Sequence, residues 1–320
     1  MSTFEGGARQ MHSSVGTVMM TVAMTVTTAT IACEPNLPGK LQMGRTIIIN
    51  TDGGAAHGSV NYGETRLLRE KEVILTFDDG PVAHRTTAVL NALEHHCVRA
   101  TFFPVGRMAM SRPDILRDTL RRGHTIGGHT WSHPNLRRIG LKRSRNEIQK
   151  GFAALEAIIG QRVAPLFRFP YLAESKKILA YVKSKDIASF SIDVDSGDTR
   201  GYGVSRVVST TMAQLRRRGR GILLFHDSKS VTVQALPQIL KRLAKEGYRV
   251  VHLETASPYH AIPDLVARYR RQLKGTPAQL AERHELTEPG AAPQRKKHWQ
   301  SSPDINSKTV DWIDKIFATE

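Results

Sequence analysis

Two clusters in the sequence combine residue types that can hold a metal ion. In Thr76–Pro81 (TFDDGP), the carboxylates of Asp78 and Asp79 follow an apolar run, and in Gly128–Pro134 (GHTWSHP), His129 and His133 are four residues apart. Residues at this spacing share one face of a helical turn, so both imidazoles can reach one ion. Two imidazoles and one carboxylate form a three-ligand site suited to zinc, with positions left for water and substrate. We therefore expect Asp79, His129 and His133 to bind the metal, which leaves Asp78 free as a base.

Either cluster alone also has an ordinary structural explanation, since an Asp pair before Gly-Pro is typical of a turn or a helix cap. Three more polar clusters follow apolar runs in the same way: Phe167–Tyr171 (FRFPY), Asp193–Asp198 (DVDSGD) and Leu223–Asp227 (LLFHD). In a β/α barrel, catalytic residues come from the C-terminal ends of several strands. Five clusters in this position therefore predict one shared active site.

The elements that must position these clusters alternate between strand and helix. Apolar segments predict strands over 73–77, 100–105, 125–130, 166–169, 188–194, 221–225 and 249–253. Helical patterns lie between them, over 86–95, 113–122, 145–159, 174–183, 207–217 and 233–246. This alternation implies parallel pairing through right-handed crossovers. The predicted fold class is α/β, a distorted (β/α) barrel of about seven parallel strands that resembles the eight-unit TIM barrel.

The sequence divides into four parts. Residues 1–33 are expected to be a signal or leader, because the chain carries no charge from Ser13 to Cys33 and Arg9 precedes this stretch. Export to the periplasm, the envelope or the medium is thus favoured over the cytoplasm. Residues 34–71 are expected to form an N-terminal arm or short hairpin, and residues 72–256 the main domain. Residues 257–320 form a basic C-terminal extension with many prolines, which we expect to be loosely attached and to contain short helices near 262–273 and 309–317.

The chain is strongly basic, with 46 Lys and Arg against 29 Asp and Glu, for a net charge of +17. Such a charge favours anionic partners such as nucleic acid, acidic polysaccharide or a membrane surface. The basic residues are not interleaved with aromatic residues, so we expect solvated helix faces and no nucleic-acid partner. Association with anionic envelope surfaces stays open, as does the oligomeric state. Only two cysteines are present, which excludes a CxxC metal site.

The five clusters, in this order, resemble the five motifs of the polysaccharide deacetylase family, also called the nodulation-protein-B homology domain or carbohydrate esterase family 4. The likeness extends from about Glu72 to Thr255 and includes the intervening segments ATFF and GHTIGGHT. It is strongest to the bacterial chitooligosaccharide deacetylase type. One position departs from the family pattern, because Thr199 stands where an aromatic residue is expected after Asp198. One wall of the sugar groove is therefore altered.

The resemblance implies a role for each motif residue. Asp78 would be the general base, and Asp79, His129 and His133 would bind a divalent metal, with Zn²⁺ favoured and Co²⁺ as the alternative. Arg168 would orient Asp78, and Asp198 would hold Arg168 in turn.

The remaining motif residues would contact the substrate. The resemblance implies that His226 is the general acid, that the backbone N–H of Tyr171 binds the oxyanion, and that Leu224 lines the pocket for the acetyl methyl group.

The implied activity is hydrolysis of a linear amide, in which N-acetyl groups are removed from an oligo- or polysaccharide containing N-acetylglucosamine. A chitooligosaccharide is the first expected substrate. The alternatives are a peptidoglycan deacetylase, an O-acetyl glycan deacetylase and a non-catalytic polysaccharide-binding protein. Asp78 and His226 argue against the last, because binding alone needs no acid and base beside a metal.

Overall fold

The computed structural model describes Met1 and residues 40–63 and 66–275. The predicted leader at 1–33 and the helix predicted at 309–317 therefore fall outside the described residues, apart from Met1. Within the described ranges, no helix combines the length and the apolar composition needed to span a bilayer.

The strands form two parallel sheets. In the larger sheet, β3 lies between β9 and β4, β5 follows β4, and β8 pairs with the far side of β9. The smaller sheet has the order β2-β7-β6, and a bridge between Gly128 and Phe167 connects the two sheets. The strands from β3 to β9, which contain or precede the five motifs, are β3 (Glu72–Asp78), β4 (Thr101–Phe103), β5 (Thr125–Ile126), β6 (Leu166–Phe167), β7 (Ala188–Phe190), β8 (Val194–Asp195) and β9 (Gly221–His226). This α/β arrangement of parallel strands confirms the predicted fold class.

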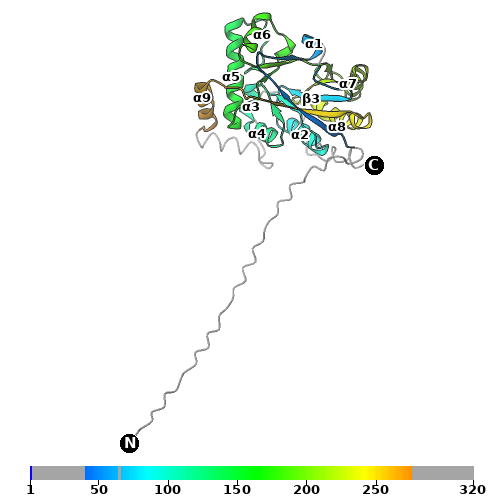
Figure 1. The fold of residues 1–320 in the computed structure, drawn as a ribbon, viewed down its shortest axis with the longest axis horizontal. Coiled ribbons are helices and arrows are strands. Elements are labelled where there is room, and N and C mark those ends of the chain that lie inside the picture. Colours follow the sequence, from blue (N-terminus) through cyan, green and yellow to red (C-terminus); the bar gives the residue numbers. More distant parts are fainter. Residues whose placement is uncertain (2–39, 64–65, 276–320) are drawn as a thin grey trace, which may run out of the picture. The chain divides into compact units, whose positions relative to one another are not determined.

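Helices surround the strands (Figure 1). They are α1 (Ser59–Tyr62), α2 (Arg85–His95), α3 (Gly106–Ser111), α4 (Pro113–Arg121), α5 (Leu141–Ile159), α6 (Lys176–Lys183), α7 (Val204–Arg218), α8 (Ser230–Lys245) and α9 (Pro263–Leu273), with a 3₁₀ turn at Pro170–Leu172. The six helices predicted within the main domain are present, whereas α3 was not predicted. One apolar cluster joins β3 and β9 to α2, α7 and α8. A second cluster contains buried residues of α3, α4, α5, α6 and α9.

Strand β3 is the centre of the larger sheet, and its sequence explains this position. All seven of its residues are buried. Buried strands of parallel sheets are typically continuous apolar runs, and Val73–Phe77 fits this pattern except for Thr76. The Thr76 hydroxyl donates a 2.6 Å hydrogen bond to the Leu223 carbonyl of β9, which satisfies the polar group. The apolar run therefore fixes the strand, and the carboxylates of Asp78 and Asp79 follow it at the C-terminal end.

The N-terminal arm is not a hairpin. Strand β1 (Gln42–Ile49) pairs in parallel with β10 (Arg249–Thr255), whereas β2 (Ala56–His57) pairs with β7 in the other sheet. Strand β10, predicted as the seventh barrel strand, lies between β1 and the start of β3. The arm contributes to both sheets because its short apolar runs need partners that a two-stranded ribbon alone does not supply.

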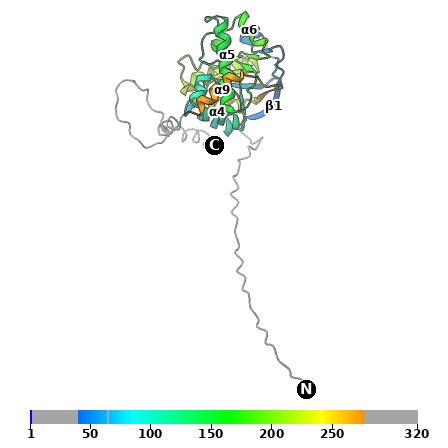
Figure 2. The same ribbon diagram turned by 90° about the vertical axis from the view of Figure 1, so that its left-hand side faces the viewer.

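The start of the C-terminal extension is also not loosely attached. Helix α9 lies against α5 in both views (Figures 1 and 2). Its residues Val266 and Tyr269 are buried in the second apolar cluster. The apolar face of α9 is thus part of the core.

Candidate active site

Strand register places the proposed base and acid side by side. Asp78 is the last residue of β3 and His226 the last of β9, and the two are paired positions of these adjacent parallel strands. Asp79 leaves the strand in a left-handed conformation (φ 78°), and its N–H donates to the Phe103 carbonyl of β4. Because of this conformation at Asp79, the carboxylates of Asp78 and Asp79 both lie near His129 at the C-terminal end of β3.

Asp79, His129 and His133 converge on one point. The Asp79 Oδ1 atom lies 3.3 Å from His133 Nε2 and 3.7 Å from His129 Nε2. One ligand atom from each residue lies within 4.8 Å of the others. Asp79 Oδ1 is buried and lacks a hydrogen-bond partner. A cation would satisfy this oxygen, so the donor set fits a divalent metal.

The protonation of the two histidines suits a metal ligand. His129 Nδ1 lies 2.7 Å from the Arg168 carbonyl oxygen, which can only accept, so Nδ1 carries the proton and Nε2 offers its lone pair. Burial, with the nearby charge of His133, lowers the pKa of His129 to about 3. Burial also lowers the pKa of His133. Metals bind the neutral imidazole, which is the form that this pocket favours.

The two histidines approach each other by a different route from the predicted helical turn. Residues 129–133 form an irregular loop, in which Thr130 (φ 67°) and His133 (φ 61°) adopt left-handed conformations. The Thr130 hydroxyl accepts a 3.0 Å hydrogen bond from the His133 N–H. The predicted proximity is confirmed and the predicted helix is wrong, because side-chain spacing does not reveal the backbone conformation of a loop.

Arg168 is fully buried and holds Asp78. Its Nη1 atom donates to Asp78 Oδ1 at 2.8 Å and to the Thr76 hydroxyl at 2.7 Å. Its other nitrogens donate at 3.1 Å to the carbonyls of Phe190 and Ser191. Burial raises the pKa of Asp78, and the charge of Arg168 opposes this rise. Asp78 Oδ2 is 3.9 Å from His129 Nε2 and so faces the metal ligands.

Asp198 contacts His226, and the expectation that it holds Arg168 is wrong. Its carboxylate accepts hydrogen bonds from His226 Nδ1 at 2.8 Å, the His226 backbone N–H at 2.7 Å and the Thr232 hydroxyl at 2.6 Å. Backbone carbonyls fill the place beside Arg168 that Asp198 was expected to occupy. Burial alone would lower the pKa of His226, but the Asp198 hydrogen bond and the nearby carboxylates raise it to about 9. His226 is therefore held in its protonated form.

The other predicted residues lie around this centre. Tyr171 is 67% exposed and adopts φ 59°, with its ring 4.7 Å from that of His133. Leu224 is buried on β9, two residues before His226. Thr199 is exposed in the turn that follows Asp198.

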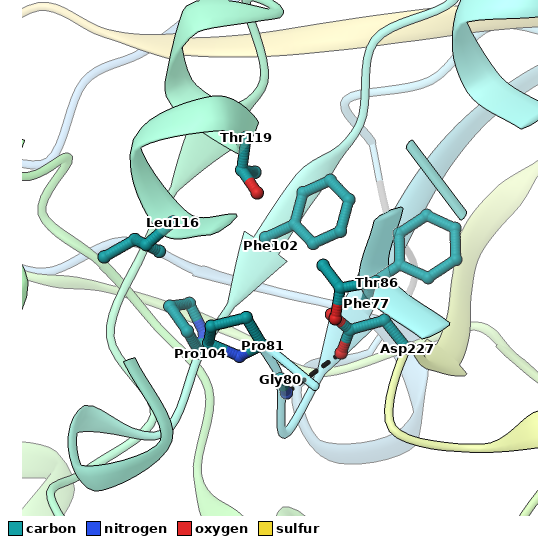
Figure 3. Close-up of a pocket in the computed structure, with 9 residues that line it drawn as sticks. All are labelled: Phe77, Gly80, Pro81, Thr86, Phe102, Pro104, Leu116, Thr119 and Asp227. Atoms are coloured by element: carbon teal, nitrogen blue, oxygen red, sulfur yellow. Dashed lines mark hydrogen bonds between the residues drawn. The ribbon is translucent and has the colours of Figure 1, made fainter. Parts of the chain in front are cut away.

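Asp227 joins the ends of β3 and β9 to the start of α2. Its carboxylate accepts hydrogen bonds from the Gly80 N–H at 2.9 Å and from the Thr86 hydroxyl at 2.6 Å. Figure 3 shows this side chain beside a small cavity also lined by Phe77 and Phe102. Burial raises the pKa of Asp227 to about 7. The hydrogen bonds of Asp227 therefore join the residue after β9 to the DDGP segment and to α2.

Thr76, Thr232 and Glu147 also support the site and were given no role from sequence. Glu147 of α5 accepts from the Ser132 N–H at 2.8 Å, within the loop of the two histidines. Thr76 belongs to the recognised TFDDGP motif, so its position was a usable signal. Nothing in the local sequence around Glu147 or Thr232 indicated their contacts, which join segments far apart in the chain.

The sequence of this chain is similar to those of known proteins. A family model described as polysaccharide deacetylase matches residues 66–190. A chitooligosaccharide deacetylase of Bradyrhizobium sp. (strain ANU 289) is 31% identical over 204 residues, which cover 59% of this chain and 91% of the relative. This chain belongs to the polysaccharide deacetylase family.

Other members of the family extend the comparison. The peptidoglycan-N-acetylmuramic acid deacetylase PdaC of Bacillus subtilis (strain 168) is 34% identical over 188 residues, and the match covers 59% of this chain but only 39% of PdaC. A solved peptidoglycan deacetylase of Bdellovibrio bacteriovorus superposes with a TM-score of 0.61 at 31% identity, covering 68% of this polysaccharide deacetylase family member and 60% of the solved chain.

Proposed function

We propose that this family member is a metal-dependent N-deacetylase of glycans that contain N-acetylglucosamine. The observation that carries the proposal is the pairing of Asp78 with His226 beside the Asp79, His129 and His133 group. A base, an acid and a three-ligand metal site at one strand end match the needs of amide hydrolysis. A protein that only binds polysaccharide needs no such set.

The side chains divide the proton transfers between two atoms. Arg168 occupies Asp78 Oδ1, so Oδ2 remains to accept the proton of the attacking water. Asp198 occupies His226 Nδ1, so Nε2–H remains to donate a proton to the leaving nitrogen. The water oxygen forms a bond to the acetyl carbon while the carbonyl π bond opens to an oxyanion. When that π bond re-forms, the C–N bond breaks, which yields acetate and an amino sugar. A bound divalent cation would polarise the acetyl carbonyl and lower the pKa of the water.

The remaining contacts orient the substrate. The left-handed turn at Tyr171 and the low exposure of Leu224 support the roles of oxyanion donor and wall of the acetyl pocket. Zn²⁺ is the proposed metal because two imidazoles and one carboxylate suit it, with Co²⁺ as a substitute. We further propose export, because a glycan polymer of the cell envelope lies outside the cytoplasm and the uncharged stretch Ser13–Cys33 has the layout of a secretory signal.

The deciding experiment measures acetate released from N-acetylated chitooligosaccharides and from purified peptidoglycan, before and after chelation and after Zn²⁺ is restored. Release that is lost with the chelator and recovered with Zn²⁺ supports the proposal. Preference between the two glycans decides the substrate class, and acetate from O-acetylated xylan alone would replace the N-deacetylase with an esterase. Absence of release from all three would contradict the proposed activity.

A further inference from the structure

The loop that carries both histidine ligands has an aromatic side chain at its centre, Trp131. The loop backbone is anchored on both sides. The N–H groups of Gly106 and Arg107 in α3 donate at 2.9 Å to the carbonyls of Thr130 and Trp131, and the Trp131 N–H donates at 3.0 Å to the Glu147 carbonyl of α5. The Trp131 side chain extends beyond these anchors and packs against the second apolar cluster.

The partner of Trp131 comes from the C-terminal helix. The rings of Trp131 and Tyr269 are stacked, with centroids 5.0 Å apart and planes at 22°. Tyr269 is only 5% exposed and lies on α9, which packs along α5. Helix α9 is outside residues 66–190, the part that the family model matches. The contact therefore joins the ligand loop to a segment beyond the shared motifs.

The loop needs such support. Thr130 and His133 are left-handed, and a β-branched residue in that conformation persists only where its surroundings hold it. Trp131 lies directly between these two strained residues. A stacked aromatic pair stabilises a contact beyond the area that it buries, so we expect its loss to loosen the loop.

We propose that Tyr269 is a positioning residue, through which α9 holds Trp131 and so keeps His129 and His133 in the geometry that binds metal. This inference rests on the proposed metal site. Substitution of a residue that orients a metal ligand commonly lowers metal affinity by about 10- to 100-fold. Because Tyr269 acts through Trp131 and not on a ligand directly, we expect Tyr269→Ala to weaken metal binding by about tenfold, the lower end of that range.

The test measures the Zn²⁺ dissociation constant of the full chain by competition with a chromophoric chelator, together with the thermal midpoint of the metal-free protein. Tyr269→Phe keeps the stacked ring and should bind within about twofold of wild type, since affinity follows the ring and not the hydroxyl. Tyr269→Leu fills the site without a ring and replaces Tyr269→Ala if that variant does not fold. Val266→Ala is the matched control, because Val266 is buried on the same helix. Its substitution should loosen the packing of α9 without removing the stacked ring.

Weaker Zn²⁺ binding by Tyr269→Ala or Tyr269→Leu, with binding retained in Tyr269→Phe and Val266→Ala, supports the proposal. Equal affinity in all four variants overturns it, even if the thermal midpoints fall. Equal weakening in Val266→Ala also overturns it, because general loosening of α9 would then explain the effect. A wild-type chain that binds no Zn²⁺ contradicts the metal site itself, and this outcome is distinguishable because it appears before any substitution.

Discussion

His226 and Asp198 show how one contact sets the ionisation of a residue at the site. The Asp198 carboxylate bonds to both the ring and the backbone of His226, and its charge contributes to a His226 pKa of about 9. A general acid must be protonated, and His226 is protonated below its pKa. We therefore expect the alkaline limb of kcat/KM to lie well above the ordinary histidine range.

Substituting Asp198→Asn should move that limb to lower pH. The amide can still accept from the His226 backbone N–H but lacks the charge that favours imidazolium, so the proton is lost at lower pH, with a shift of about one unit or more. Asp198 is not among the proposed metal ligands, so comparison with wild type isolates its effect. The measurement is a kcat/KM profile at saturating Zn²⁺, and an unchanged limb would show that another group controls it.

Removal of the acid itself gives a second expectation at this scale. His226→Ala should lower kcat/KM by about 10²- to 10⁴-fold and flatten the alkaline limb, because no donor remains to titrate. Its acidic limb should survive, since Asp78 is retained. Near-wild-type activity with an unaltered alkaline limb would exclude His226 as the acid.

The metal ligands allow a separate residue-scale prediction. His129→Ala should abolish Zn²⁺ binding and acetate release while the far-UV circular dichroism stays native, because His129 lies in a loop and not in a strand. His260→Ala is the matched control, since His260 is exposed and distant in sequence from the ligand loop. Full activity of His129→Ala without bound metal, measured by atomic emission, would exclude the assigned site.

At the scale of elements, strands and helices were predictable and the connections between them were not. Apolar runs such as Val73–Phe77 predicted the strands, because a buried parallel strand requires them. The loop from His129 to His133 was predicted as helical, but its left-handed residues depend on anchors from α3 and α5. Asp198 was assigned the wrong partner for a similar reason, since its contact with His226 is between segments distant in the sequence.

The junction of β3, β9 and α2 gives an element-scale prediction. A Cβ added at Gly80 would lie 2.0 Å from the Asp227 Oδ2 atom, within the hydrogen bonds that join these elements. Gly80→Ala should therefore lower the free energy of unfolding by about 1–3 kcal/mol, as overpacked cores usually do. Gly203→Ala has nothing within 4 Å of its added Cβ and serves as the control. Urea unfolding measures both, and equal stability of the two variants would contradict the close packing at Asp227.

At the scale of the whole molecule, buried neutral histidines make the stability of the folded chain depend on pH. His124 is 3% exposed, and its Nδ1 accepts a 3.1 Å hydrogen bond from the Ala100 N–H. Burial, with the charges of His252, Arg122 and Arg99, lowers the pKa of His124 to about 3. The unfolded chain binds this proton near pH 6.5, so below that pH it binds more protons than the folded chain, and stability falls as the pH falls.

For His124 alone, the expected loss between pH 7 and pH 5 is about 2 kcal/mol. His124→Gln keeps an acceptor for the Ala100 N–H but does not titrate, so its stability should depend less on pH by that amount. The comparison requires urea unfolding of metal-free wild type and variant at several pH values. Parallel pH dependences would show that His124 does not contribute.

The pairing of Asp78 with His226 on neighbouring strands has a consequence for divergence within the family. Hydrogen-bonded parallel strands lie about 4.8 Å apart whatever loops follow them, so sheet geometry sets the spacing between these two groups. Insertions or substitutions in the loops around these strands, such as Thr199 in place of an aromatic residue after β8, can reshape the sugar groove without altering that distance. Members of the family can therefore differ in glycan preference through changes in these loops, while the spacing of the proposed base and acid stays the same.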